Sequence, residues 1–250
     1  MLQKILILCL CVVAGIHHPV IADTSKVIAT AGATTIEGAA GGGIVPWAVI
    51  NGYASTEQWS ATAMSTLVTV DDFTLQAVGA SLSVDNRFEV SLTKQTFDLD
   101  TMGGKLGQDI IGIKYKLAGE LLYTSLPQIS VGLQYKRVDD FTIPNAVGAR
   151  NDWGLDAYLA ASKVYFDAIA GRNLVTNLTL RATKANQTGL LGFGTTTNND
   201  YHLQTEVSVA LLLTDNIALG YEYKQKPNQL SFAKEDDWQD IFMAWFINKH

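Results

Sequence analysis

Apolar and polar residues alternate with a period of two along most of the chain. In the segment 87–97, for example, Phe88, Val90 and Leu92 share one face and polar residues occupy the other. Successive side chains of a strand point to opposite faces of its sheet, so this pattern predicts strands. No segment after residue 22 keeps a helical stripe, and we expect an all-β fold. Eleven strands are predicted, at residues 44–53, 59–70, 73–84, 87–97, 108–117, 128–137, 153–166, 171–184, 201–213, 217–226 and 238–247.

Alternation alone does not separate a membrane barrel from a soluble β-sandwich or a lipocalin-like barrel. Two features of the segments favour the membrane. They are about ten to thirteen residues long, whereas soluble strands usually have about five or six and tilted membrane-spanning strands need about nine to eleven. Aromatic residues also gather near segment ends, as at Trp59, Tyr115, Tyr135 and Trp153, where membrane interfaces select such rings.

A third feature is the length of the connections, which alternates between short and long. Outer-membrane barrels place short turns in the periplasm and long loops outside the cell, so the alternation assigns a direction to each strand. Asp71-Asp72 is too short for this pattern, and residues 118–127 are too long. The short links are 54–58, 85–86, 167–170 and 214–216, and the long ones are 98–107, 138–152, 185–200 and 227–237.

Bacterial single-chain barrels have an even number of strands, so one strand is missing from this set. Residues 26–37 supply a weak candidate. We therefore predict an antiparallel, up-and-down transmembrane β-barrel of about 12 strands, within a range of 10–14. The last residues, Asn248-Lys249-His250, resemble the start of a turn, which predicts a C-terminally truncated sequence.

The first residues predict a signal peptide. Lys4 precedes an apolar run from Ile5 to Ile16, and Ala22 offers a small residue for cleavage. An N-terminal membrane anchor is the alternative, but the run is short for a bilayer and ends at His17, His18 and Pro19. The expected domains are a signal peptide at 1–22, a Gly/Ala/Thr-rich first strand or plug at 23–43, and a β-barrel at 44–250. The expected location is the cell outer membrane.

Composition excludes several classes of function. Both cysteines, Cys9 and Cys11, lie in the predicted signal peptide, so the mature chain would have no disulfide, thiolate metal site or cysteine nucleophile. The formal net charge of the whole chain is −6, and loss of Lys4 makes it −7. No basic run is present, so we do not expect nucleic acid as a partner.

No motif predicts a catalytic residue, a cofactor or a metal site. The run Gly41-Gly42-Gly43 lacks the ending of a phosphate loop, and a flexible loop or close-packed plug is expected there instead. The sole internal histidine, His202, could belong to a hydrolase site only with a serine in reach, and a polar residue of the lumen or rim is the simpler interpretation. The aspartate pairs 98/100, 139/140 and 236/237 could hold Ca²⁺ weakly, but solvated turns fit better.

The polar faces of the strands predict the lining of the lumen. These side chains are mixed in sign, so they could pair across a filled interior or line a narrow water-filled path. The inward glycines Gly112, Gly132 and Gly220 are expected to relieve crowding. The candidate lumen-lining residues are Glu89, Lys114, Lys116, Gln134, Lys136, Asp156, Arg181, His202, Glu206, Glu222 and Lys224.

The stretch from Glu37 to Tyr53, with its Gly-Gly-Gly-Ile-Val-Pro-Trp core, resembles the opening motif of the DUF3034 family. Later blocks at Val70–Phe73, Asp109–Lys114, Leu126–Lys136 and Trp245–His250 are similar to that family too, so the resemblance covers essentially the whole mature chain. Its members are treated as outer-membrane β-barrels of unknown function. The resemblance implies further strands beyond His250, up to fourteen in all, and no substrate, cofactor or catalytic residue.

Four functions remain open at this point. The first is passive transport of small solutes, gated by loops 138–152 and 185–200. The second is a non-conducting structural or partner-docking barrel. An enzyme centred on His202 and a soluble periplasmic barrel are the others. The expected partners are outer-membrane lipid, the outer-membrane assembly machinery during biogenesis and a small solute.

Overall fold

The computed structural model describes residues 6–10, 26–27, 29–70, 73–99, 104–230 and 236–247, with the backbone alone for 6–10 and Val70. Most of these residues form one antiparallel sheet in which each strand pairs with the next along the chain. The strands are β1 (Leu6–Leu10), β4 (Trp59–Val70), β5 (Phe73–Val84), β6 (Phe88–Asp98), β7 (Lys105–Ala118), β8 (Gln128–Val138), β10 (Trp153–Ile169), β11 (Arg172–Thr183), β13 (His202–Leu212), β14 (Ile217–Lys224) and β15 (Trp238–Trp245).

The predicted all-β, antiparallel, up-and-down arrangement is confirmed. Every strand predicted from residue 59 onward has a counterpart, and the largest shifts are at the start of β7 and the end of β10. Among the described residues the sheet has eleven strands, within the predicted range of 10–14, and its first, β1, lies within the predicted signal peptide. The rest of that peptide lies outside the described residues, as do Asp71-Asp72 and Asn248-Lys249-His250.

Residues 31–54, which we call the inner segment, depart from the prediction. The strand expected at 44–53 is wrong, and the weak strand at 26–37 is reduced to two residues. Every residue from 34 to 52 is buried, so the apolar side chains that suggested one face of a strand are covered on all sides. Pro46 also lacks the amide hydrogen that a central strand needs. The segment keeps only the short pair β2 (Ala33–Thr34) and β3 (Ala40–Gly41).

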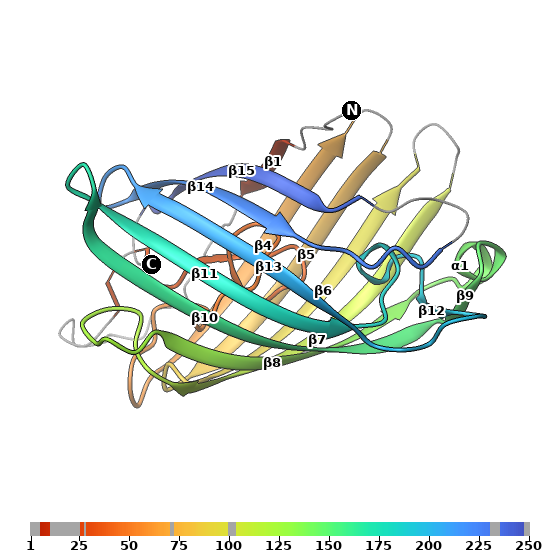
Figure 1. Cartoon of the computed structure of the whole chain (residues 1–250), viewed down its shortest axis with the longest axis horizontal. Helices are drawn as coiled ribbons and strands as arrows, with labels where there is room; N and C mark the ends of the chain where they lie inside the picture. Colours follow the sequence, from red (N-terminus) through yellow and green to blue (C-terminus); the bar gives the residue numbers. More distant parts are fainter. Residues whose placement is uncertain are drawn as a thin grey trace.

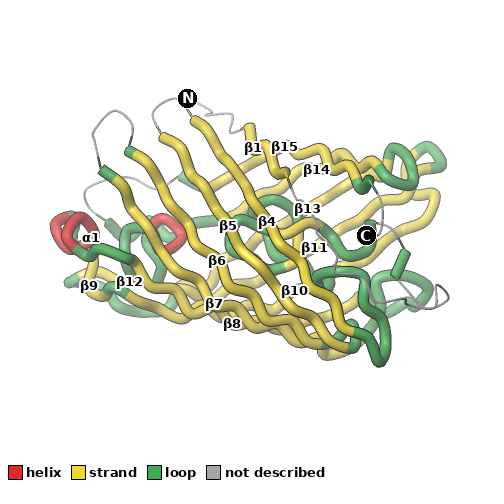
Figure 2. The backbone as a smooth tube through the Cα atoms, turned by 180° about the vertical axis from the view of Figure 1, so that it is seen from behind, coloured by secondary structure: helices red, strands yellow, loops and turns green. Residues whose placement is uncertain are grey.

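The sheet curls around the inner segment. In Figure 1 strands β10, β11, β13 and β14 pass in front of it, and β4 to β7 pass behind. Figure 2 gives the view from behind, with β4, β5 and β6 nearest the reader. We call the curled sheet the wall. Along its strands buried polar residues alternate with exposed apolar ones, so its polar face points toward the inner segment.

Glycines on the inner face of the wall make room for aromatic rings. A Cβ atom on Gly132 would lie 2.1 Å from Cζ of Tyr158, which is its cross-strand neighbour on β10. A Cβ atom on Gly220 would lie 2.3 Å from Cζ of Phe242 on β15 in the same way. These glycines therefore relieve crowding as predicted, and each does so opposite a specific ring.

The longest connections lie at one end of the sheet, although residues 119–127 at the other end form a connection of intermediate length. The connection after β8 contains α1 (Thr142–Ala146) and β9 (Ala149–Asn151), and the one after β11 contains η1 (Gln187–Gly189) and β12 (Phe193–Thr195). Because β9 pairs with β12, the two connections are joined (Figure 1). Within the described residues, no helix has the length and apolar character needed to cross a bilayer.

Replacing Gly132 with alanine should lower the free energy of unfolding by about 1–3 kcal/mol, because the added methyl group overlaps the Tyr158 ring. The loss should shrink in a Tyr158→Ala background, where the methyl group finds space. Denaturant unfolding of the two single variants and the double variant measures this coupling. Strictly additive effects would show that the ring is not what Gly132 accommodates.

Candidate functional site

Side chains of the wall hold the backbone of the inner segment. Glu222 on β14 accepts hydrogen bonds from the amides of Gly43 and Ile44, both at 2.7 Å. Buried amides and carbonyls outside regular secondary structure need such partners, because leaving them unpaired costs free energy. Similar contacts join Glu89 to the amides of Ala40 and Asn51, Lys114 to the carbonyls of Ala40 and Val49, Gln95 to the carbonyl of Ile36, and Thr179 to the carbonyl of Pro46.

Lys26, which precedes the inner segment in the chain, binds the C-terminal end of that segment. The Nζ atom of Lys26 donates to the carbonyl oxygens of Ile50 at 2.6 Å and Gly52 at 3.0 Å. Burial lowers the pKa of Lys26 to about 7. The amine can donate these hydrogen bonds in both its charged and its neutral form.

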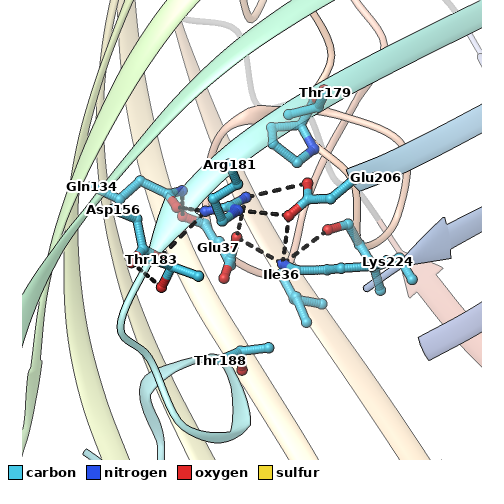
Figure 3. A network of polar contacts seen from close by, with 12 residues as sticks. Ile36, Glu37, Gln134, Asp156, Thr179, Arg181, Thr183, Thr188, Glu206 and Lys224 are labelled. Carbon is cyan, nitrogen blue, oxygen red and sulfur yellow. Dashed lines mark hydrogen bonds and ion pairs between the residues drawn. The ribbon is translucent and has the colours of Figure 1, made fainter. Parts of the chain in front are cut away.

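Glu37 is the single charged residue between Lys26 and Glu57, and it lies at the centre of a charged cluster. Its Oε1 atom lies 2.6 Å from Nζ of Lys136 on β8. Its Oε2 atom lies 3.0 Å from Nη2 of Arg181 on β11 and 3.0 Å from Nζ of Lys224 on β14. All four side chains are at most 3% exposed. Figure 3 shows Arg181 and Lys224 pointing toward Glu37 from their strands.

Two carboxylates of the wall complete the cluster. Asp156 on β10 lies 2.8 Å from Lys136 and 3.4 Å from Arg181. Glu206 on β13 lies 2.6 Å from Nε of Arg181 and 4.0 Å from Nζ of Lys224. Three cations thus face three carboxylates. Gln134 accepts a further hydrogen bond from Arg181, and Thr183 donates one to Asp156 (Figure 3).

Such a cluster is sensitive to the loss of any member. Removing charges from water is expensive, and their mutual attraction offsets this cost only when the geometry and the additional hydrogen bonds are good. Loss of one partner leaves a buried charge uncompensated. The cluster therefore fixes the position of Glu37 relative to five strands, whatever its net contribution to stability.

The structure places the predicted lumen-lining residues in two groups. Lys116 and His202 lie near strand ends, where Lys116 pairs with Glu120 at 2.6 Å and His202 contacts Asn198 at 3.3 Å. Among the described residues no serine hydroxyl hydrogen-bonds to His202. The other nine are buried on the inner face, namely Glu89, Lys114, Gln134, Lys136, Asp156, Arg181, Glu206, Glu222 and Lys224.

The acidic loop residues have partners within the protein. Asp98 pairs with Lys105 at 2.8 Å, and Asp139 pairs with Lys94. Hydrogen bonds from the side chain and amide of Thr142 lower the pKa of Asp140. Asp237 accepts a hydrogen bond from the Tyr223 hydroxyl, and Asp100 lies outside the described residues. No group of three metal-binding side chains occurs in the described part of the chain.

Little empty space remains inside the wall. One pocket borders the charged cluster and has room for about one water molecule. A second, apolar pocket between Trp47, Leu212 and Phe242 is of similar size, with room for one or two waters. Because residues 34–52 and the polar side chains of the inner face are buried against one another, the interior between the described residues is filled rather than hollow.

Sequence reasoning missed Glu37 as a site residue. The alternation with a period of two identifies side chains on the polar face of a strand, and Glu37 belongs to no strand of the wall. The available signal was its isolation, since a lone carboxylate within a long uncharged and mostly apolar stretch needs a partner if that stretch is buried.

A family model described as "Protein of unknown function (DUF3034)" matches residues 30–250. No curated protein and no solved structure matches the chain.

Replacing Arg181 with methionine should lower the free energy of unfolding by about 3–5 kcal/mol, because buried carboxylates lose their partner. The matched control is Arg137→Met, which breaks an exposed pair with Asp152 and should cost about 0–1 kcal/mol. Denaturant unfolding of both variants makes the comparison. Equal losses would mean that the buried cluster is no more critical than a surface ion pair.

Proposed function

Since the chain belongs to the DUF3034 family, whose function is unknown, we propose from its structure that it is a β-barrel of the Gram-negative cell outer membrane, sealed by its own inner segment. It is exported through the predicted signal peptide. Its long connections face the cell exterior, and its short turns face the periplasm. The observation that carries the proposal is the combination of an exposed apolar outer face with a buried polar inner face that is bonded to the inner segment.

The outer face has the chemistry of a lipid contact. Soluble monomers rarely expose continuous apolar surface on this scale. Outward charged side chains such as Lys94, Asp109 and Arg137 lie toward the strand ends that carry the long connections. The exposed apolar side chains are spread over the strands and include Leu67, Leu82, Leu92, Ile111, Ile113, Leu133, Leu155, Leu159, Leu178, Leu180, Val209, Leu219, Ile241 and Met243.

Aromatic residues support the same orientation. Exposed rings occur toward both ends of the strands, as bands at the two membrane interfaces require. Trp59, Tyr165 and Trp245 lie at the end that carries the short turns. Tyr135 and Trp153 lie side by side near the opposite end, with ring centroids 6.0 Å apart and the rings tilted by 30°.

Lipid also requires that no strand edge stays unpaired, because hydrocarbon offers no hydrogen bonds to the backbone. The two edge strands of the sheet, β1 and β15, approach within 8 Å of each other between Cα atoms. Because β1 lies in the predicted signal peptide, the edges of the mature sheet are β4 and β15, and we propose that the barrel closes between these two strands, where β1 lies in the structure. A closed wall around a filled interior makes the chain a non-conducting barrel with a structural or partner-docking role, as long as the inner segment stays in place.

Passive passage of small solutes is the second candidate, and one observation favours it. Among the described residues the inner segment is bonded to the wall only through side chains, and no backbone hydrogen bond links it to a wall strand. The inner segment can therefore move out of the barrel without breaking backbone hydrogen bonds between strands. Solutes can pass only if the segment moves in this way.

The membrane location predicts that the mature chain needs detergent for extraction. Folded and unboiled, it should migrate differently on a gel from the boiled chain, as heat-modifiable barrels do. A mature chain that stays monomeric in water without detergent would rule out the outer-membrane location.

The sealed interior predicts no channel events from the wild-type chain in planar bilayers. If events occur, an Ala48→Cys/Ser162→Cys variant decides their origin, since the Ala48 amide donates to the Ser162 hydroxyl at 2.8 Å and a disulfide there would tether the inner segment. Events that stop on oxidation and return on reduction would indicate a gated passage. Events that persist in the oxidised variant would contradict a seal made by the inner segment.

A further inference from the structure

The contacts of Glu37 resemble those of a bound ligand. Its carboxylate is met by charged donors from three strands, and both of its oxygens are engaged. We propose that Lys136, Arg181 and Lys224 form a binding site for a small carboxylate anion, and that Glu37 occupies this site while the inner segment is in place. The proposal extends the proposed function, because a solute reaches the site only through the barrel.

The charges of the wall support this assignment. Lys136, Arg181 and Lys224 carry three positive charges, while the wall carboxylates of the cluster, Asp156 and Glu206, carry two negative charges. Without Glu37 the cluster keeps one buried positive charge in excess. A buried charge without a counter-ion is strongly unfavourable, so the vacated site should recruit an anion.

No other charge of the wall depends on the inner segment in this way. Lys114 lies 3.6 Å from Glu89, a carboxylate of the wall itself, and it binds the inner segment through carbonyl oxygens. Glu222 binds the segment through amides. Residues 27–56 contain no charged residue besides Glu37, so the inner segment supplies charge to the wall only at this cluster.

The geometry favours a carboxylate over a spherical anion. One oxygen of Glu37 faces Lys136, and the other is shared by Arg181 and Lys224. Two oxygens held in one plane match this divided set of donors, and a guanidinium is well suited to carboxylate recognition. The pocket beside the cluster is also lined by Thr188 and Lys226, which lie in or next to the long connections. A solute arriving from that end would meet Lys226 before it reaches the cluster.

Rescue of a Glu37→Ala chain by acetate tests the site, because the substitution removes the carboxylate and leaves space for a free one. The full-length variant should melt below the wild type. Sodium acetate in large excess should raise its melting temperature by about 5 °C or more, and acetamide should not. Sodium chloride at equal ionic strength should have a smaller effect, and the wild type should not respond to acetate.

The matched control is Glu37→Ala/Lys224→Met, in which the excess positive charge is gone and acetate should have no effect. Acetate that leaves Glu37→Ala unchanged, or that stabilises all three proteins equally, overturns the site. If Glu37→Ala does not fold alone, its refolding yield with and without acetate is compared, and equal yields overturn the site too.

These outcomes are separate from those of the proposed function. Melting can be followed in whichever medium keeps the chain folded. Rescue in a chain that needs no detergent would overturn the membrane location and keep the anion site. A heat-modifiable barrel that acetate does not rescue would keep the membrane location and overturn the anion site.

Discussion

Burial of an irregular segment inside a curled sheet is the constraint on which the structure depends. Residues 34–52 form only a two-residue pair of strands and a few turn hydrogen bonds, so several of their amides and carbonyls, such as the amides of Gly43 and Ile44, take their partners from outside the segment. The wall supplies those partners through side chains such as Glu89, Lys114 and Glu222. This explains why the inner face is polar although it is hidden from solvent. The wall and the inner segment are therefore complementary, and neither satisfies its polar groups without the other.

The strands could be predicted because their two faces differ. In β6, for example, Glu89 and Ser91 face the inner segment while Phe88 and Leu92 are exposed, so the period of two is visible in the sequence. The inner segment lacks this contrast. Its residues are buried on every side, and a buried apolar stretch does not reveal by composition whether it is a strand. Pro46 was the local evidence against a strand at 44–53.

Only part of the site could be predicted. The alternation of polar and apolar residues identified Lys136, Arg181 and Lys224 as inward residues, since each lies on the polar face of its strand. Their common partner was not predictable, because Glu37 lies 99 positions from Lys136 and 144 positions from Arg181 along the chain. Such distant contacts depend on how the sheet curls, and strand periodicity carries no information about curvature. The partners of the inner glycines, Tyr158 and Phe242, are by contrast cross-strand neighbours and follow from register.

The bond between Glu222 and the amide of Gly43 spans 179 positions, which has a consequence for the order of assembly. Ribosomes synthesise the inner segment before strands β4 to β15, yet its contacts with β14 wait until that late strand exists. Until then its apolar residues and unpaired amides have no permanent partner, and contacts of such large sequence separation form slowly. The first part of the domain to be made is thus among the last to be fixed, and the interval between is when the nascent chain is most exposed to aggregation.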